Sequence, residues 1–442
     1  MSTSATMTIR KTPAEEAFVR HFEAVAGDLP AAAASQEARR AAIARFEGLG
    51  LPHRRIEAWK YTDLRNQLRN VASPAVGEAP AVDRDALDEA LGNLAGLDAY
   101  RAVFLNGRFA GSLSSLPDET GIRAENLAAS SGAASSGDGD ERIASESIVA
   151  LNEAFVTDGL LFETAANAVL DKPLLIVSAR AGAEDLLVTL RHDITLGSNS
   201  EATILETAVS IGLTGGQANA RVDMTISDGA RLRHLKIGSA SPLVDLATWA
   251  ARLGRDASYK ALQLTAGAPL ARNQSYMSFD GPGADLDFSA AVLANGRDHV
   301  DTTVVVEHLA PGCRSRELFK AVLDGEACAV SQGKVIVDRE AQKTDGKQMA
   351  QALMLSETAE FDSKPELEIY ADDVACGHGS TSARIDPDYI FYLRSRGIPR
   401  AEAEALLTEA FIAEVFDHVD AEDIRDVVVE RARAWLAANA NR

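Results

Sequence analysis

The sequence predicts a mainly β protein in which a β-solenoid core is flanked by helical regions at both ends. From about residue 168, short segments with a hydrophobic period of two follow one another, and turn residues separate them. Similar turn-like pieces recur within this stretch at a nearly constant interval. The sequence before and after it has the hydrophobic spacing of amphipathic helices instead.

The repeat is the main indication of a solenoid. The recurring pieces are SNSEATI, SDGARL, GRDASY, PGADLD and PGCRSR. Their small central residues follow one another at intervals of 28, 27, 27 and 29 residues, and they are Ala202, Ala230, Ala257, Ala284 and Cys313. A fixed period of this size indicates units that bury their apolar faces by stacking on one another. A sandwich or barrel with evenly spaced strands is the alternative.

Composition and charge exclude several classes of protein. The 442 residues carry a net charge of −21, whereas binding to nucleic acid or to anionic lipid needs basic surface. The three cysteines are too few and too widely spaced for a disulfide framework or a CxxC zinc site. The N-terminus lacks an apolar signal region, and no uncharged apolar run is long enough to span a membrane. We therefore expect a cytoplasmic protein with free thiols.

Residues 1–95 are expected to form a helical N-terminal region. Thr12 and Ser35 are candidate N-caps, since each is followed by a run with helical spacing of its apolar residues. Trp59 lies among charged residues in the segment 54–68. We expect this segment to be a short helix or turn whose aromatic side chains anchor the N-terminal region on the main body.

Residues 96–167 are expected to form a mixed segment that links this region to the core. The pair Asn106-Gly107 lies between two apolar runs and predicts a β-hairpin with a two-residue turn. The small, polar and glycine-rich stretch 128–141 is typical of a flexible loop. A helix is expected over 144–157.

Residues 168–385 are expected to form the solenoid core. Alternation such as Val222, Met224 and Ile226 indicates one buried face. The segment 243–254 could be either a strand or a helix. The segments of strand type are AVLDKPLLIVSA, LLVTLRHDITLG, ATILETAVSIG, RVDMTISDG, RLRHLKIG, YKALQLTAG, DFSAAVLANG, TTVVVEHLAPG and KVIVD.

Residues 386–442 are expected to form a helical C-terminal region that begins after Asp386-Pro387. A solenoid exposes unpaired strand edges at its ends, and the flanking helical regions could cover them. An apolar stripe at helical spacing runs through this region, and its members are Ala403, Leu406, Leu407, Ala410, Phe411 and Val415. From the residues alone, this stripe is either plain core or a docking face.

The sequence contains no complete catalytic pattern. GGQANA at 215–220 lacks the GK[ST] ending of a phosphate-binding loop, and no Rossmann fingerprint is present, so we expect no nucleotide on this chain. Neither a GxSxG nor an HExxH motif occurs, and the eight histidines are scattered.

Cys376 and His378 are the remaining candidates for chemistry. They lie two residues apart after a strand-like run, so in an extended chain they would point to the same side. Thiolate and imidazole are good ligands for iron and zinc, but two ligands are too few for a metal site in one chain. A turn without chemistry is the alternative.

Several stretches resemble the SufB/SufD family of iron–sulfur cluster assembly scaffold proteins. The core resemblance lies in QMAQALMLSETAEFDSKP, KPELEIYADDVACGHGST and FYLRSRGI, and GLPHRRIEAWKYTDL and VFLNGRF resemble the entry segment of SufD-type chains. SufB-type chains carry a glutamate-containing ARVEHEATTSKIG-like segment where this chain has ADDVACGHGSTSARID. The resemblance and the length therefore favour the SufD type.

The resemblance implies a right-handed parallel β-helix core and a complex with SufB and the ATPase SufC. It implies that the chain is a scaffold subunit and not an enzyme, that it pairs with SufB through the two β-helices, and that SufC docks on residues 386–418. The candidate docking residues are Tyr389, Phe391, Tyr392, Leu393, Arg396, Leu406, Leu407 and Phe411. Pairing of the isolated chain with itself is a further possibility.

The resemblance also implies a role for the cysteine–histidine pair. Cys376 and His378 match the cysteine and histidine of the family's KCSHGAT-type segment, while Ala375 and Gly377 replace its lysine and serine. The pair would supply ligands to iron or a transient cluster shared with SufB and would aid iron acquisition. Cys313 is expected in the solenoid core or at its corners, together with Cys328.

Two other functions are alternatives. A SufB-like scaffold with its own persulfide role fits the same family. β-Solenoids also serve as carbohydrate-active enzymes, but no secretion signal supports that reading here. An enzyme would act alone, whereas a SufD-type chain would co-purify with SufB and SufC.

Overall fold

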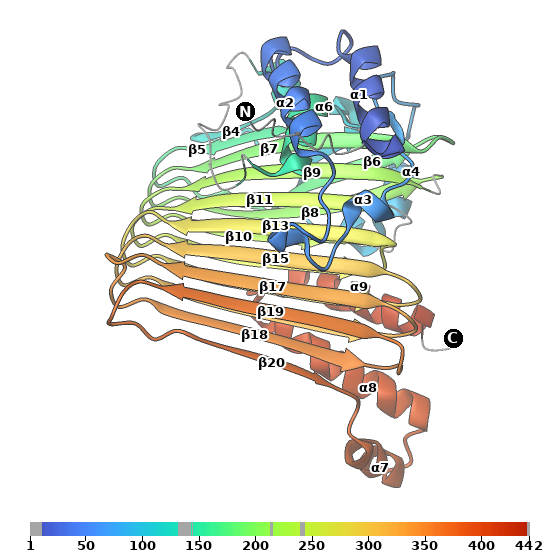
Figure 1. The fold of residues 1–442 in the computed structure, drawn as a ribbon, viewed down its shortest axis with the longest axis vertical. Coiled ribbons are helices and arrows are strands. Elements are labelled where there is room, and N and C mark those ends of the chain that lie inside the picture. Colours follow the sequence, from blue (N-terminus) through green and yellow to red (C-terminus); the bar gives the residue numbers. More distant parts are fainter. Residues whose placement is uncertain (1–10, 131–142, 144, 213–214, 239–243, 440–442) are drawn as a thin grey trace, which may run out of the picture.

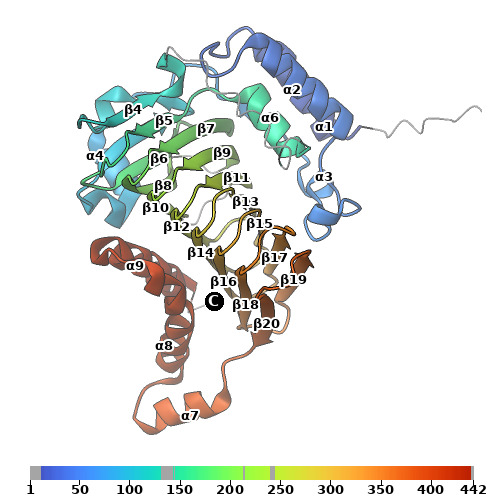
Figure 2. The ribbon, with the colours of Figure 1, turned by 90° about the vertical axis from the view of Figure 1, so that its left-hand side faces the viewer.

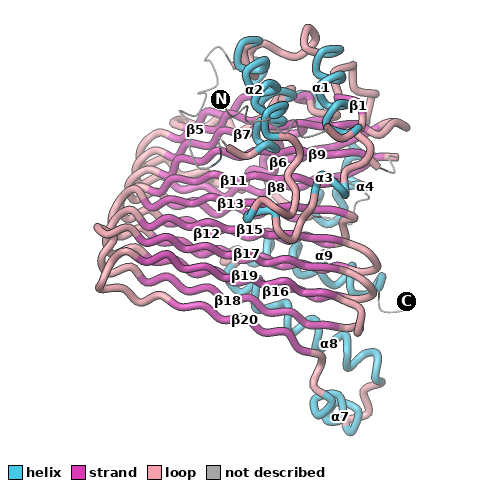
Figure 3. Tube along the Cα trace, viewed as in Figure 1, coloured by secondary structure: helices cyan, strands magenta, loops and turns pink. Residues whose placement is uncertain are grey.

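The computed structural model describes residues 11–130, 143, 145–212, 215–238 and 244–439. Within this part of the chain two ten-stranded sheets face each other, and successive strands alternate between them along the core (Figures 1 and 3). From β5 onwards every strand pairs in parallel with the strand two places along, as in a solenoid. The predicted β-solenoid is confirmed, and the sandwich alternative is wrong.

Sheet A runs from β4 to the end strand β19, with β1 paired beside β7. Its strands are β1 (Ser73–Pro74), β4 (Ile122–Asn126), β5 (Leu160–Thr164), β7 (Leu186–Leu196), β9 (Gly216–Ile226), β11 (Val244–Leu253), β13 (Leu270–Phe279), β15 (His299–His308), β17 (Cys328–Val337) and β19 (Glu360–Ile369). The ambiguous segment 243–254 is therefore a strand over its described residues.

Sheet B runs from β3 to the end strand β20. Its strands are β2 (Tyr100–Leu105), β3 (Arg108–Phe109), β6 (Leu174–Ala181), β8 (Glu201–Ile211), β10 (Arg231–Ile237), β12 (Ser258–Ala266), β14 (Asp285–Ala294), β16 (Arg314–Leu323), β18 (Asp345–Met354) and β20 (Gly377–Ala383). Because β2 belongs to this sheet, the linking segment 96–167 is part of the solenoid's first turns.

The main core lies between the sheets, where inward side chains stack turn upon turn. Val222, Met224 and Ile226 of β9 point inward and are buried, as their alternation predicted. Hydrophobic burial on this scale supplies most of the favourable free energy of folding.

The small-residue repeat lies at the corner before each strand of sheet B, but one of its members was assigned wrongly. Ala230, Ala257, Ala284 and Cys313 occupy equivalent positions and are buried. Arg231 pairs with Glu201, so the residue equivalent to Ala230 is Ser200 and not Ala202. A serine fits this corner because it is small and its hydroxyl donates to the carbonyl of Gly197 at 2.7 Å.

The N-terminal helices cover the outer face of sheet A, on the opposite side of the solenoid from the C-terminal helices (Figure 2). They are α1 (Pro13–Val25) and α2 (Gln36–Leu49), which pack with α6 (Ser147–Phe155). Thr12 caps α1 in a capping box with Glu15, and Ser35 caps α2, as predicted. The predicted helix 144–157 corresponds to α6.

The segment 54–68 anchors this region as predicted. It contains the short helices η1 (Glu57–Trp59) and α3 (Leu64–Gln67). The Trp59 ring is buried against sheet A, with the guanidinium of Arg272 3.8 Å from its centre. The indole nitrogen donates to Glu146 at 3.1 Å.

The predicted hairpin is confirmed by the antiparallel pair β2–β3. Asn106 and Gly107 form its turn with φ of 47° and 77°, a left-handed conformation that suits these two residues. Most of the predicted flexible loop 128–141 lies outside the described residues. The helix α4 (Arg84–Leu91) follows the N-terminal segment and packs near sheet B.

The C-terminal region forms α7 (Pro387–Ser395), α8 (Arg400–Ala413), η5 (Glu414–His418) and α9 (Glu422–Asn439). α9 and η5 pack on the outer face of sheet B, and α7 projects beyond the last strand (Figures 1 and 2). The helices therefore cover a face of the solenoid and not its end, contrary to the expected capping role. In the described part of the chain, no helix is long and apolar enough to cross a membrane.

Candidate functional site

The cysteine–histidine pair lies on the last strand of sheet B. Cys376 directly precedes β20 and stands opposite Gly346, and His378 pairs with Gln348. Gly346 and Gln348 are buried positions of β18, so both members of the pair lie on the inward face of the solenoid. Cys376 is half-buried against the core, whereas His378 is exposed because, in the part of the chain that the structure describes, no further strand stacks on β20.

Backbone contacts hold the turn that delivers this pair. The backbone carbonyl of Asp373 accepts a hydrogen bond from the backbone amide of Lys343 at 2.7 Å. The backbone amide of Asp373 donates to the side-chain oxygen of Gln342 at 3.0 Å. The amide of Ala375 then donates to the carbonyl of Thr344 at 2.8 Å. These bonds fix the register in which Cys376 enters β20.

The environment of Cys376 favours the neutral thiol. Partial burial raises the pKa of this thiol above its usual value of 9.0, and the nearby carboxylates of Asp345 and Glu317 raise it further. A hydrogen bond with the backbone of Gly346 opposes these effects only in part. A metal ion that bound here would therefore have to displace the thiol proton.

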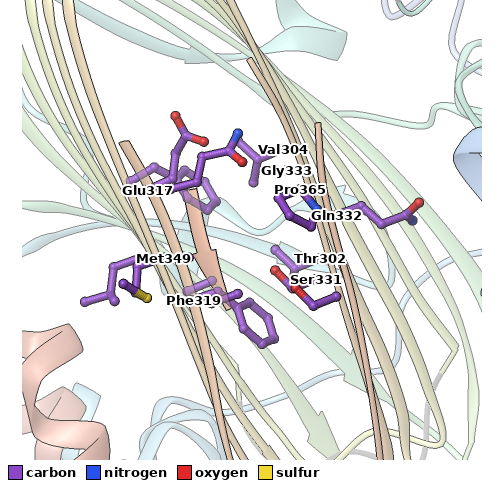
Figure 4. A pocket seen from close by; sticks show the side chains of 16 residues that line it. Thr302, Val304, Glu317, Phe319, Ser331, Gln332, Gly333, Met349 and Pro365 are labelled. Carbon is purple, nitrogen blue, oxygen red and sulfur yellow. The ribbon is translucent and has the colours of Figure 1, made fainter. Parts of the chain in front are cut away.

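A small cavity lies between the sheets below the open end. Its volume is about 40 Å³, and Glu317 on sheet B faces Val304, Gly333 and Pro365 on sheet A across it (Figure 4). Glu317 and Gln348 are each only 8% exposed. Among the described residues, neither the Glu317 carboxyl nor the Gln348 amide makes a hydrogen bond of standard geometry, although the two groups lie close enough for the amide to lower the pKa of the carboxyl. Such groups usually find a partner or water when buried.

Burial raises the pKa of the Glu317 carboxyl to about 7. The nearby Ser315 hydroxyl, the Gln348 amide and the charge of Arg316 oppose this shift. Neither Glu317 nor Gln348 was among the residues that the sequence pattern predicted for the site. The alternation along each strand predicts which of its residues face the core. It does not predict the pairing between distant strands that aligns Glu317 and Gln348 with His378.

The end of the solenoid exposes two strand edges. Every residue of β19 is at least partly exposed, and so is every residue of β20. Large apolar side chains near this end are also exposed, and they are Met349, Leu355, Ile369 and Tyr370. Free strand edges beside apolar surface are typical of a surface that pairs with another sheet.

A second exposed apolar surface lies on α7, none of whose residues is buried. Tyr389, Phe391 and Tyr392 are 62%, 75% and 55% exposed, respectively. The guanidinium of Arg396 lies 4.9 Å from the centre of the Tyr392 ring, and Leu393 is half-buried.

The candidate docking residues of α8 do not form one free face. Leu406 is 45% exposed and Leu407 is half-buried. Phe411 points toward the solenoid, where it packs under Lys320 of β16. The predicted stripe is thus divided, since Ala403 and Val415 are buried while Ala410 is exposed.

The remaining cysteines lie away from this pair. Cys313 is buried at its corner, as predicted. Cys328 begins β17 and is half-buried, and burial together with Glu360, Asp362 and Asp301 raises the pKa of its thiol to about 12. In the part of the chain that the structure describes, no group of three or more histidine, cysteine or acidic side chains could hold a metal ion.

The fold and this site define a parallel β-solenoid protein in which the cysteine–histidine pair lies at an open end instead of being enclosed. Family comparisons agree. Residues 13–176 match the SufBD protein N-terminal region, and residues 179–411 match the SufBD core domain of the SUF system for FeS cluster assembly. The chain therefore belongs to the SufBD family, which supports a role in iron–sulfur cluster assembly.

Two relatives are similar over most of the chain, and a third is similar over about one third of it. The iron–sulfur cluster assembly protein SufD of Escherichia coli (strain K12) is 31% identical over 395 residues, which cover 88% of this chain and 90% of that protein. The SufBD family protein slr0076 of Synechocystis sp. is 30% identical and covers 86% of each chain. SufD of Bacillus subtilis is 32% identical over 149 residues, 34% of each chain. The resemblance to SufD-type chains is confirmed.

Proposed function

We propose that this chain is the SufD-type scaffold subunit of a complex with SufB and the ATPase SufC, and that it is not itself an enzyme. The observation that carries this proposal is the position of Cys376 and His378 on the inward face of an uncovered end strand. Two ligands do not complete a metal site. A second chain that stacks on this end would supply the rest.

SufB would bind at the open end of the solenoid. The edges of β19 and β20 offer unpaired backbone groups, and Tyr370 adds exposed apolar surface beside them. A partner solenoid that docks here would bury Cys376 and His378 at the junction. The isolated chain could use the same edges to pair with itself.

SufC would bind to the exposed aromatic side chains of α7. Tyr389, Phe391 and Tyr392 expose large rings on a helix that projects from the body, and aromatic residues dominate the binding energy of many interfaces. ATP-driven pairing of two SufC subunits would pull α7 and α8. Because α8 is attached to β16 through Lys320, this motion would reach the end of the solenoid.

Iron or a nascent cluster is the cargo of the junction. His378 would supply an imidazole and Cys376 a thiolate, which are both suitable ligands for iron. Since the surroundings of Cys376 raise its pKa, we assign the first contact with iron to His378 and sulfur delivery mainly to SufB.

Co-expression with SufB and SufC tests this proposal. The three chains are expected to purify as one complex, and His378→Ala is expected to lower its iron and sulfide content at least severalfold without loss of subunits. Ser380→Ala is the matched control, because Ser380 is exposed on the same face of β20. Unchanged iron and sulfide in the His378→Ala complex would refute the ligand role. Persulfide on Cys376, detected by mass spectrometry, would instead favour a SufB-like role.

A further inference from the structure

Three residues on neighbouring strands form one inward-facing column that ends at the candidate site. Glu317 of β16 pairs with Gln348 of β18, and Gln348 pairs with His378 of β20. Register partners in a parallel sheet point to the same side, and adjacent strands are about 4.8 Å apart. The three side chains therefore follow one another from the cavity to the open end.

The middle residue has unused hydrogen-bonding capacity. Neither the oxygen nor the nitrogen of the Gln348 amide makes a hydrogen bond of standard geometry among the described residues, although the side chain is nine-tenths buried and lies beside the Glu317 carboxyl. An amide presents one acceptor and one donor group. A buried amide without well-formed hydrogen bonds destabilises the folded state, so its presence here calls for an explanation.

The neighbours of Gln348 match these two groups. The Glu317 carboxyl below it lies close enough for the amide to lower the pKa of that carboxyl, and it can accept a hydrogen bond from the amide nitrogen. The His378 imidazole above it makes no side-chain hydrogen bond within the described chain, and its ring N–H can donate to the amide oxygen. Histidines that bind metals usually donate their second ring nitrogen in this way, which fixes the ring's orientation and tautomer.

Gly333 on the opposite sheet provides the space in which the Gln348 amide lies, and the adjoining cavity leaves room for the amide to turn. A Cβ at Gly333 of β17 would lie only 3.0 Å from Gln348 Oε1, so the absence of a side chain there creates the space that the amide now occupies. The cavity of about 40 Å³ adjoins the same groups. Rotation about side-chain torsions can thus bring the amide toward His378 without a shift of the backbone.

We propose that Gln348 is a positioning residue for His378. Its amide oxygen accepts a hydrogen bond from one imidazole nitrogen, so that the other nitrogen is directed at the iron cargo, while its amide nitrogen donates to Glu317. This inference rests on the proposed ligand role of His378. In this arrangement Gln348 and Glu317, which lie one and two strands inside the end strand, control the orientation of the His378 imidazole.

Two substitutions of Gln348 separate positioning from packing. Gln348→Met keeps the size of the side chain and removes the acceptor, whereas Gln348→Glu keeps an acceptor oxygen and adds a second buried carboxyl. If Gln348 positions His378, Gln348→Met will weaken iron binding by the complex about 10- to 100-fold, and Gln348→Glu will restore much of it. If Gln348 only fills space, Gln348→Met will bind iron normally and Gln348→Glu will be the impaired variant.

The measurement is iron affinity of the purified three-subunit complex, determined by competition with a ferrous chelator, with His378→Ala alongside. Loss of affinity in His378→Ala with normal affinity in Gln348→Met overturns the positioning role alone. Normal affinity in both variants overturns the ligand role of His378 as well. Circular dichroism and subunit stoichiometry of each variant complex establish that it is folded and assembled.

Discussion

The ammonium group of Lys320 lies 4.5 Å from the centre of the Phe411 ring. The same group donates to the Phe411 carbonyl at 2.9 Å and pairs with the Glu414 carboxylate. Lys320 belongs to β16, whose inward side carries Glu317 at the cavity. One strand therefore connects the C-terminal helices to the interior beneath the candidate site.

Lys320→Met is expected to loosen α8 from the solenoid. The substitution keeps the apolar stem but removes the cation–π contact and the charged hydrogen bond, at a cost of about 1–3 kcal/mol. Hydrogen exchange in Arg400–Ala413 should accelerate while exchange in the central strands stays slow. Lys343→Met is the control, because Lys343 pairs with Asp373 on the exposed surface and should matter little. Equal exchange in both variants would contradict the attachment.

Trp59→Ala is expected to release the segment that anchors the N-terminal region. The change removes a fully buried ring, its contact with Arg272 and the hydrogen bond to Glu146, and should cost about 3–5 kcal/mol. Urea unfolding measures the loss, and limited proteolysis should cut near residues 51–68. Tyr61→Ala, at a half-buried ring beside Lys60, should cost about 1 kcal/mol or less. A comparable loss in the two variants would argue against a specific anchor.

Much of the fold could be predicted from local patterns. The hydrophobic period of two predicted the strands, and the recurring small residues predicted the stacked turns. Both patterns follow from the way one turn of the solenoid packs on the next. The assignment of Ala202 failed because its piece resembles the others while the strand pairing aligns Ser200. Only the pairing of distant strands reveals that offset.

The site could be predicted only in part for the same reason. Cys376 and His378 stand close together in the sequence, so their shared side followed from strand geometry. Gln348 and Glu317 lie far away along the chain, and the turns between strands vary in length. The divided stripe of α8 has another cause, since that helix packs through a narrow face that includes Thr408 and leaves Leu406 outside.

Ala257→Leu is expected to disturb the stacked corners. Ala257 is fully buried between Ala230 and Ala284, and three extra carbon atoms have no space there. Overpacking of this kind costs about 1–3 kcal/mol, measurable by urea unfolding. Cys313→Ala introduces the alanine that is found at the equivalent position of the other corners. It should lower the free energy of unfolding by less than about 1.5 kcal/mol. The reverse order of costs would contradict the corner role.

Glu317→Gln is expected to change how stability depends on pH. Burial raises the pKa of Glu317 from 4.5 to about 7, so the folded state binds its proton more tightly than the unfolded state. The contribution of this group is therefore full below about pH 4.5 and is lost as pH rises through 7. A shift of this size corresponds to about 3 kcal/mol.

Urea unfolding of the wild-type chain and of Glu317→Gln at pH 5 and pH 8 provides the measurement. The variant should gain stability relative to the wild type at pH 8 and little at pH 5, because glutamine avoids the buried charge. Asp287→Asn of the neighbouring strand β14, whose side chain lies outside the core, should show no such gain at pH 8. An equal difference at both pH values would show that ionisation of Glu317 does not limit stability.

Phe391→Ser and Tyr370→Ser are expected to separate the two proposed interfaces. Both rings are largely exposed, at 75% and 62%, so neither substitution should change the free energy of unfolding by more than about 0.5 kcal/mol. Phe391 lies on α7 and its loss should weaken SufC binding at least tenfold, about 1.4 kcal/mol, with SufB pairing intact. Tyr370 lies beside the open end, so Tyr370→Ser should weaken SufB pairing and leave SufC binding unchanged. Pull-down and calorimetric titration with each partner distinguish these outcomes, and a variant that affected both partners equally would contradict the separation of the two surfaces.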